Sequence, residues 1–351
     1  MKKALITGIT GQDGAYLAEF LLTKGYRVFG TFRRSSTPNF WRLCDLNIES
    51  KITLIPADVS DMASMLEAIT LSEPDEIYNL AAQSFVGASF EKPLLTLDVD
   101  GASTTILLEC IRLLNKNIKF YQASTSELYG NTASNGFIID ENTVMEPASP
   151  YAAAKLYSYH AVKIYREAYG LFASNGILFN HESPLRGLEF VTRKITNIAA
   201  QIKLGLADEL YLGNIDSIRD WGYAKEYVEG MWKILQADNP DDFVVATGEA
   251  HSIEELLAVS FNRLGLDWKK YVKLDEQLKR PLDVGFLLGD ISKLKSKTNW
   301  EPKMKFEELI TLMVDTDLNR WEKYLRGELF SWDAPNYPQN LKILTRKGIN
   351  K

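Results

Sequence analysis

Cysteine is scarce in this sequence. Cys44 and Cys110 are the only two among 351 residues, and no Cys-x-x-Cys or Cys/His set has the spacing of metal ligands. Two lone cysteines are typical of a protein from a reducing cytoplasm. The sequence also lacks a run of about 18 apolar residues that could span a membrane, and its first apolar stretch, from Ala4 to Ile6, is too short for a signal peptide. We therefore expect a cytoplasmic protein with no metal site and no membrane partner.

An excess of positive charge is also absent. The formal net charge is −6, from 40 Lys and Arg against 46 Asp and Glu, whereas nucleic-acid-binding proteins usually present a basic surface. We expect no nucleic-acid partner, although a local basic pocket for phosphate groups is compatible with this balance. With 46% hydrophobic residues, the chain has the composition of a globular protein, and its length predicts about two domains.

Short apolar runs alternate with helical patterns through the first half of the sequence. The runs that predict strands are Lys3–Thr7, Tyr26–Phe32, Ile52–Ile55, Glu76–Leu80, Ile118–Ala123 and Gly176–Phe179. The intervening helices are predicted at Tyr16–Leu22, Ser60–Ile69, Pro93–Leu114 and Pro150–Tyr169. This alternation predicts an α/β fold, with a doubly wound parallel sheet covered by helices on both faces.

The second half of the sequence has a less regular pattern. Helices are expected at Thr192–Leu204, Ala224–Gln236, Ile253–Leu264 and Phe306–Tyr324, with short strands at Glu209–Leu212 and Phe243–Thr247. We expect residues 1–185 to form the sheet domain, and residues 186–351 to form mainly a smaller mixed α/β lobe with crossovers to the sheet. The proline-containing tail after Trp332 is expected to be an extended surface segment.

A glycine-rich turn joins the first predicted strand to the first predicted helix. Its sequence, Gly8-Ile-Thr-Gly-Gln-Asp-Gly14, permits a tight turn and lets a pyrophosphate approach the helix N-terminus. The spacing is G-x-x-G-x-x-G, so the flanking strand and helix carry the assignment. The turn predicts a Rossmann-type dinucleotide site, and a purely structural turn is the alternative. The expected contacts are Gly8, Thr10, Gly11, Gln12, Asp13 and Gly14.

The end of the second strand predicts which dinucleotide binds. A carboxylate here would bind the ribose diol of NAD, but the chain has Arg33, Arg34, Ser35 and Ser36. Arginine pairs bidentately with phosphate and serine hydroxyls donate further hydrogen bonds, so this run favours the 2′-phosphate of NADP. A solvated pair of charges is the alternative. Further contacts, at the adenine and along the cofactor, are expected from Asp58, Val59, Leu80, Ala81, Ala82, Gln83 and Ser84.

Tyr151 and Lys155 lie four residues apart on a predicted helix, and therefore on one helix face. A Lys ammonium beside a phenol lowers the phenol pKa, which predicts Tyr151 as a general base and Lys155 as its partner and ribose anchor. Thr125 is placed to hydrogen-bond the hydroxyl being oxidised, and Glu127 supplies a second base for a carbon acid next to a ketone. A surface Tyr–Lys pair and a solvent-facing glutamate are the alternatives.

Six strings of this sequence share one resemblance. They are Gly8–Gly14, Arg33–Ser36, Thr125–Gly130, Tyr151 with Lys155, Phe179–Gly187 and Arg219–Gly222. Together they resemble the GDP-mannose 4,6-dehydratases, a family of extended short-chain dehydrogenases/reductases, over nearly the whole chain. Asn180-His-Glu-Ser-Pro is the most specific string. The resemblance implies conversion of GDP-mannose to GDP-4-keto-6-deoxymannose by internal hydride transfer with tightly bound NADP.

The resemblance also implies roles for individual residues. Thr125, Glu127 and Tyr151 would be catalytic with Lys155 as ribose anchor, while His181 and Arg186 would lie along the cofactor. The expected substrate contacts are Ser84, Ser126, Glu127, Asn180, Lys194, Arg219, Arg280 and Asp283. The resemblance further implies a homodimer or homotetramer, in which the segment Thr37–Leu43 would reach a neighbouring copy.

The chain departs from the family pattern at three places. Leu95 stands where members often have Tyr, Arg280-Pro-Leu-Asp283 replaces Arg-Pro-Thr-Glu, and the segment after Ser36 is shorter and more aromatic. A GDP-D-glycero-D-manno-heptose 4,6-dehydratase is therefore an alternative, as is another nucleotide-sugar epimerase or reductase of this fold, against which Glu127 argues. A non-catalytic NADP-sensing protein or a structural scaffold would not need the Tyr151/Lys155 pair.

Overall fold

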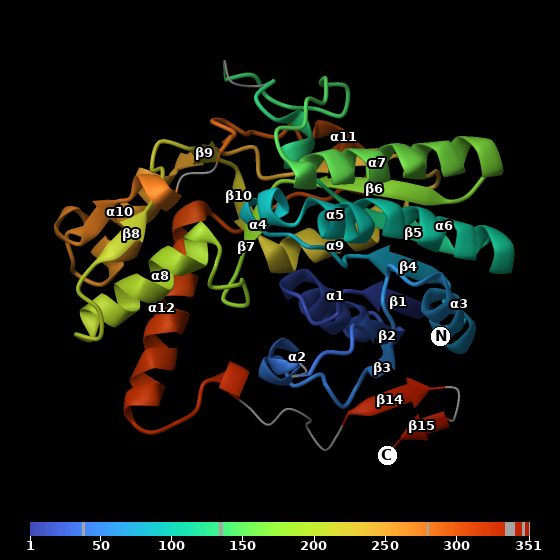
Figure 1. Cartoon of the computed structure of the whole chain (residues 1–351), viewed down its shortest axis with the longest axis horizontal. Coiled ribbons are helices and arrows are strands. Elements are labelled where there is room, and N and C mark those ends of the chain that lie inside the picture. Colours follow the sequence, from blue (N-terminus) through green and yellow to red (C-terminus); the bar gives the residue numbers. More distant parts are fainter. Residues whose placement is uncertain (37–38, 133–135, 279–280, 334–340, 346–347, 351) are drawn as a thin grey trace.

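A nine-stranded sheet forms the centre of the computed structural model, which describes residues 1–36, 39–132, 136–278, 281–333, 341–345 and 348–350. The strand order is β11-β6-β5-β4-β1-β2-β3-β14-β15, and all are parallel except β15 (Figure 1). The strands are β1 Lys3–Thr7, β2 Arg27–Phe32, β3 Thr53–Pro56, β4 Glu76–Asn79, β5 Lys119–Thr125, β6 Ala173–Leu178, β11 Asp242–Val245, β14 Lys342–Thr345 and β15 Gly348–Asn350. The predicted doubly wound parallel sheet is confirmed.

Helices cover both faces of this sheet because its inner strands are apolar on both sides. Along β1, Ala4 and Ile6 pack in one core with α1 and α9, whereas Leu5 packs in the other with α3, α6 and α7. These helices span α1 Gln12–Thr23, α3 Met62–Ser72, α6 Ser103–Leu114, α7 Pro150–Tyr169 and α9 Ala224–Gln236. Shorter helices are α2 Trp41–Asp45, α4 Val86–Glu91, α5 Pro93–Thr96 and α11 Ser292–Thr298. Alternation of buried side chains along a strand therefore creates the two layers.

The long helix predicted for residues 93–114 is interrupted. After α5, a π-helical segment spans Leu97–Ala102 before α6 begins. Single π turns are rare and often occur at functional sites. Here the segment places Asp100, which is 1% exposed, beneath the N-terminal part of α7. Residue spacing alone predicts a continuous helix because apolar residues recur at helical intervals on both sides of the interruption.

A smaller lobe lies beside the carboxyl ends of the strands (Figure 1). Its core is formed by α8 Val191–Lys203, α10 Ile253–Arg263 and α12 Phe306–Leu325, together with β8 Leu210–Leu212 and β13 Val272–Leu274. Two short pairs connect it to the sheet domain, β7 Asn180–Glu182 with β10 Trp221–Tyr223 and β9 Ile218–Arg219 with β12 His251–Ser252. Short 3-10 turns occur at η2 Ser126–Tyr129, η3 Trp268–Lys270, η4 Glu276–Leu278 and η5 Ser331–Asp333.

Two late parts of the sequence return to the sheet. β11 pairs with β6 at one edge, as the expected crossover requires, and β14 pairs with β3 near the other. The tail expected to be an extended surface segment therefore contributes a strand at 342–345, while residues 334–340 lie outside the described part of the chain. Among the described residues, we find no helix with the length and apolar character to cross a bilayer and no cluster of side chains suited to hold a metal ion.

Candidate active site

The glycine turn after β1 packs directly against the chain that follows β4. Gly8 has a φ of 68°, and a Cβ there would lie 2.8 Å from the backbone of Ala81. A Cβ on Gly14 would lie 2.6 Å from Ile9 Cα, so a larger residue would force the turn open. Gly11 donates from its N–H to Gly8 O at 3.0 Å, and α1 then begins at Gln12. This compact turn leaves backbone N–H groups at the helix N-terminus, which is the geometry that binds a pyrophosphate.

A cavity of about 320 Å³ opens at this turn, along the carboxyl ends of β1, β4, β5 and β6. The predicted cofactor contacts that line it are Gly8, Thr10, Gly11, Gln12, Asp13, Gly14, Leu80, Ala81, Ala82, Ser84, Tyr151, Lys155, His181 and Arg186. Its wall also includes Ser124, whose buried hydroxyl has no hydrogen-bond partner among the described residues. We name it the first cavity, and its elongated lining is suited to a dinucleotide.

The structure does not bring every predicted cofactor residue to this cavity. The exposed run Arg33–Ser36 follows β2 outside its lining, at the position expected for a 2′-phosphate contact. Asp58, Val59 and Gln83 are also outside the lining; Asp58 instead accepts hydrogen bonds from Ser60, and the Gln83 N–H donates to Asp100 Oδ1 at 2.8 Å. The roles proposed for these residues stay predictions.

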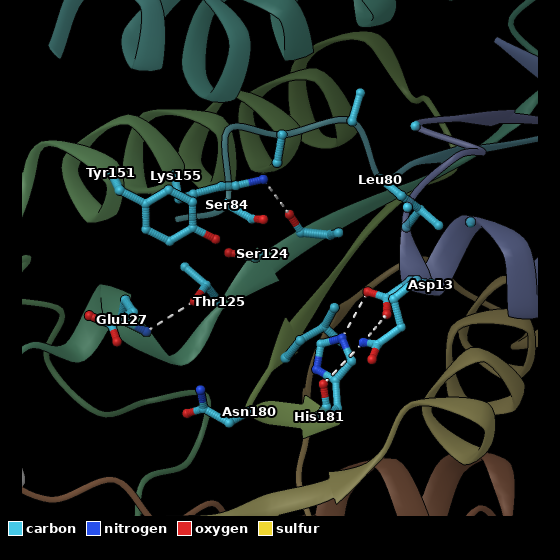
Figure 2. A pocket seen from close by; sticks show the side chains of 18 of the residues that line it. Asp13, Leu80, Ser84, Ser124, Thr125, Glu127, Tyr151, Lys155, Asn180 and His181 are labelled. Carbon is cyan, nitrogen blue, oxygen red and sulfur yellow. Dashed lines mark hydrogen bonds and ion pairs between the residues drawn. The ribbon is translucent and has the colours of Figure 1, made fainter. Parts of the chain in front are cut away.

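The predicted catalytic residues converge from β5, η2 and α7 on one wall of the first cavity (Figure 2). Ser149 caps α7 by accepting from Ala152 N–H at 3.1 Å, which fixes the start of the helix that carries Tyr151 and Lys155. At the end of β5, the Thr125 hydroxyl accepts a hydrogen bond from Glu127 N–H at 3.2 Å. The side chains of Thr125, Glu127 and Tyr151 thus lie on one side of the cavity.

The electrostatics of this wall are set by burial and by neighbouring charged groups. Burial raises the pKa of the Tyr151 phenol, and the Asp100 carboxylate raises it further, whereas a hydrogen bond with Thr125 and the Arg186 charge lower it. The Lys155 ammonium lies 5.9 Å from the centre of the Tyr151 ring and donates to Ala123 O at 3.1 Å. The Lys155 ammonium is thus directed to that carbonyl, and the lowering of the Tyr151 pKa by Lys155 stays a prediction.

Asp100 is a site residue that the sequence did not suggest. Burial raises the pKa of its carboxyl to about 6, and its charge opposes the burial that lowers the pKa of Lys155. Its Oδ2 has no hydrogen-bond partner among the described residues. The sequence does not distinguish Asp100 from Asp98, a second carboxylate in the same segment that is exposed.

A second cavity of about 540 Å³ extends from the first toward the smaller lobe. Both are lined by Glu127, Asn180, Arg186 and Phe190, so Glu127 lies at their junction. The second cavity also has aromatic and basic side chains in its walls, namely Phe85, Phe90, Trp221, Lys194 and Arg219. A groove with aromatic and cationic groups is suited to a base and a diphosphate.

The predicted substrate residues are distributed over both cavities. Ser84 and Ser126 line the first, whereas Lys194, Arg219 and Asp283 line the second. Arg219 and Asp283 form an ion pair of 3.6 Å. Arg280 lies outside the described residues. The aromatic residues Phe85, Phe90 and Phe190 were missed from the sequence, because an isolated Phe is more often part of a core.

Comparison with known families decides the assignment. The family model described as GDP-mannose 4,6 dehydratase matches residues 5–313. This chain belongs to the GDP-mannose 4,6-dehydratase family. It is 50% identical over 327 residues to GDP-mannose 4,6 dehydratase 2 of Arabidopsis thaliana, covering 90% of this chain and 87% of that protein. It is 49% identical over 340 residues to GDP-mannose 4,6 dehydratase of Homo sapiens, covering 90% and 91%.

Solved structures show the same fold at lower sequence identity. UDP-glucose 4-epimerase of Thermus thermophilus, in complex with NAD, superposes with a TM-score of 0.79 at 26% identity, covering 90% of this chain and 98% of that one. The dTDP-glucose 4,6-dehydratase of Bacillus anthracis, also with NAD, superposes with a TM-score of 0.80 at 19% identity, covering 92% and 98%. The second likeness shows the fold alone. The family predicted from the sequence motifs is confirmed by the matched family model and by the relatives from Arabidopsis thaliana and Homo sapiens.

Proposed function

We propose that this chain converts GDP-mannose to GDP-4-keto-6-deoxymannose as an NADP-dependent 4,6-dehydratase. The observation that carries the proposal is the position of Glu127, which lines both cavities and lies on the same wall as Tyr151 and Thr125. A carbonyl-forming site needs a phenol, a hydroxyl and a lysine, whereas elimination of water additionally needs a base for the neighbouring carbon. Glu127 supplies that base at the junction of the two cavities, where the sugar of a bound substrate would lie.

The first cavity fits a dinucleotide. The turn at Gly8 and Gly14 has no room for a Cβ, so backbone N–H groups can approach a pyrophosphate closely. Arg33 and Arg34 are exposed after β2, where they can pair with a 2′-phosphate. NADP held there would supply a hydride acceptor for the oxidation at C4 and the same hydride for the reduction at C6, so the reaction would need no external oxidant. The structure of the Thermus thermophilus epimerase contains NAD, and that of RMD from Pseudomonas aeruginosa contains NADPH. Both support a nicotinamide cofactor here.

The side chains on the common wall divide the proton transfers. Tyr151 accepts the proton of the C4 hydroxyl as that carbon is oxidised, and Thr125 hydrogen-bonds the same oxygen. Glu127 then removes the C5 proton, which the new C4 ketone has made acidic, and protonates the C6 hydroxyl as it leaves as water. When C6 is reduced, C5 takes up the proton that Tyr151 accepted from the C4 hydroxyl, so that the atoms and electrons balance with loss of one water.

The lining of the second cavity supports guanosine diphosphate as the nucleotide part of the substrate. Lys194 and Arg219 bring positive charge to a chain of net charge −6, and both line the cavity with Asp283, which can accept from ribose hydroxyls. Gly87 lines the same cavity with the Phe85 ring packed against it. The second candidate substrate is GDP-D-glycero-D-manno-heptose, whose sugar carries an extra carbon.

We also propose a cytoplasmic homodimer or homotetramer. The exposed face of the π segment and α7 is apolar, with Leu97 46%, Tyr157 50% and Ile164 57% exposed, and a second copy would cover it. In the segment 37–43, expected to reach a neighbouring copy, Phe40 and Leu43 are buried in their own copy, and residues 37–38 lie outside the described chain. Both cysteines are free, which favours a reducing compartment.

The proposed reaction is tested by incubating purified protein with GDP-mannose, without added reductant, and following the product by mass spectrometry. The proposal expects a nucleotide sugar lighter by one water, formed over many turnovers with the cofactor that the protein retains. A requirement for one NADPH per turnover would instead identify a reductase. An isomer of unchanged mass would identify an epimerase, and the absence of any product would contradict the dehydratase.

A further inference from the structure

The loop 183–187 separates the two cavities. It carries Arg186, which lines both of them, forms a 3.2 Å ion pair with Glu182 and stacks 3.6 Å from the centre of the Phe190 ring. A shift of this loop would therefore change the shape of the cofactor end and of the nucleotide-sugar end together. The loop has no strand or helix of its own, so its position depends on the side chains that bind its backbone.

Two arginines of the smaller lobe, one buried and one half-buried, hold the loop. Arg193, on α8, donates to Pro184 O at 2.6 Å and to Arg186 O at 3.0 Å, and its ion pair with Asp317 is 1% exposed on each side. Arg320, on α12, donates to Pro184 O at 2.7 Å. These bonds attach the loop to the substrate lobe, since neither arginine belongs to the sheet domain.

A third arginine, from the sheet domain, also binds the loop. Arg42, on the short helix α2, donates from Nε to Leu185 O at 2.7 Å and from Nη1 to Thr10 O at 3.1 Å. Thr10 belongs to the nucleotide turn, so one guanidinium joins the turn to the loop. The guanidinium also stacks on Trp41, 4.5 Å from the ring centre. Burial lowers the pKa of Arg42 to about 10, which leaves it charged at neutral pH.

A second connection runs in parallel. The Ser183 hydroxyl donates to Gln12 Oε1 at 2.7 Å, while Leu185 N–H donates to the same hydroxyl at 3.0 Å. Gln12 also donates from Nε2 to His181 O at 3.1 Å. Nucleotide turn and loop thus form one hydrogen-bonded unit, in which Arg42 is the member that makes bonds to backbone carbonyls of both parts.

We infer that Arg42 is a positioning residue that fixes the nucleotide turn and the Arg186-bearing loop relative to each other. Cofactor binding and nucleotide-sugar binding then depend on the same side chain. The inference rests on the proposed function for the identity of the two ligands. Arginine suits this place because its planar fork presents donors in fixed, diverging directions, whereas a lysine ammonium is a single point. Without Arg42, two buried carbonyls would lose their donor and the loop could drift from the turn.

The test compares Arg42→Lys and Arg42→Met with the unchanged protein in two binding measurements. One is the rate at which bound NADP leaves the holoenzyme after dilution, and the other is the Kd for GDP by calorimetry. We expect both to rise in Arg42→Met, by roughly ten-fold or more, the scale for hydrogen bonds that involve a charged group. Arg42→Lys is expected to recover only part of the loss, because one ammonium cannot replace both donors.

Arg263→Met is the matched control. Arg263 makes a 2.8 Å ion pair with Asp315 on the surface of the smaller lobe, distant in the chain from the loop, and its loss should change neither binding measurement. An Arg42→Met or Arg42→Lys variant that shows only a lower thermal midpoint, or a change at one ligand alone, would overturn the inference. If Arg42→Met fails to fold, Arg42→Lys decides in the same way. Lack of turnover of GDP-mannose by the unchanged protein would contradict the proposed function instead.

Discussion

Asp13 and His181 form an ion pair in the lining of the first cavity, with Asp13 Oδ2 2.8 Å from His181 Nε2 (Figure 2). The other ring nitrogen, Nδ1, donates to Phe179 O at 2.7 Å, and the ring stacks on Tyr227 at 4.8 Å. Burial by itself lowers the pKa of His181, but the Asp13 charge and hydrogen bond reverse this, so that the net direction is upward. The same pairing lowers the pKa of Asp13 against its burial. The pair connects the nucleotide turn to β7.

We expect Asp13→Asn to change how stability depends on pH. Because the pKa of His181 is raised in the folded protein, its contribution to stability is full below about pH 6.5 and is lost as the pH rises through the folded pKa. Because the pKa of Asp13 is lowered, its contribution to stability is present above about pH 3.9 and is lost as the pH falls through the folded pKa. In Asp13→Asn, burial and the Arg186 charge lower the pKa of His181 and only the Phe179 carbonyl raises it, so the decline toward alkaline pH should disappear. Thermal unfolding between about pH 5 and pH 9 measures this, and equal slopes for both proteins would contradict it.

Glu127→Gln should fold and bind cofactor but lose dehydration. The amide keeps the shape of the side chain and cannot act as a base, so turnover should fall by roughly 10²–10⁴. Oxidation at C4 should persist, visible as reduced cofactor absorbance in a single turnover. Glu254→Gln, at an exposed position on α10, is the control and should be fully active. Near-normal dehydration by Glu127→Gln would remove this residue from the mechanism.

Asp100→Asn should move both the acidic and the alkaline limb of the pH profile of kcat toward lower pH. The Asp100 charge raises the pKa of Tyr151 and also raises the pKa of Lys155 against its burial, so its removal lowers both. Asparagine can still accept from Gln83 N–H, which keeps the local fold. A profile that is unchanged, or that moves to higher pH, would show that Asp100 does not act on these two groups.

Arg33→Ala should weaken the binding of NADP more than that of NAD, because only NADP has a 2′-phosphate to lose. A charged hydrogen bond contributes about 1.5–3 kcal/mol, so a loss of roughly 10- to 150-fold is expected for NADP. Arg27→Ala, at the opposite end of β2, serves as the control and should leave the preference intact. An equal loss for both cofactors would mean that Arg33 does not select between them.

The choice of sugar is tested by comparing kcat/KM for GDP-mannose, GDP-D-glycero-D-manno-heptose and dTDP-glucose. We expect GDP-mannose to be the best substrate, with the heptose second, since the proposed contacts Lys194, Arg219 and Asp283, which line the second cavity, would bind the nucleotide and not the sugar end. A marked preference for dTDP-glucose would contradict a guanosine site. A large preference for the heptose would leave the reaction intact and change only the substrate.

Local chemistry made part of this fold predictable. The bounds predicted for α7 and α9 agree with the structure. For α7 the reasons are visible, because Ser149 caps the start, Pro150 fits the first turn and Gly170, at a φ of 69°, ends the helix. The nucleotide turn was equally accessible, since its glycines are required by contacts between nearby segments of the chain.

Long-range contacts account for what the sequence could not show. β14 joins the sheet because its backbone pairs with β3, from which most of the chain separates it, and no local pattern specifies that partner. Arg42 looks like an ordinary helix residue until Leu185 and Thr10 are seen beside it. Asp100 and Lys155 likewise become neighbours only when α7 packs against the π segment. Spacing reveals which residues share an element, whereas tertiary packing decides which elements meet.

The pairing of β11 with β6 has a consequence for how the chain folds. All six residues of β6 are buried, and β11 covers the edge that β6 would otherwise present. A fragment of residues 1–185 would expose that edge as a template for pairing with other chains, and it should aggregate. Because β11 comes from residues 242–245, we expect the sheet to need this later part of the chain to fold completely.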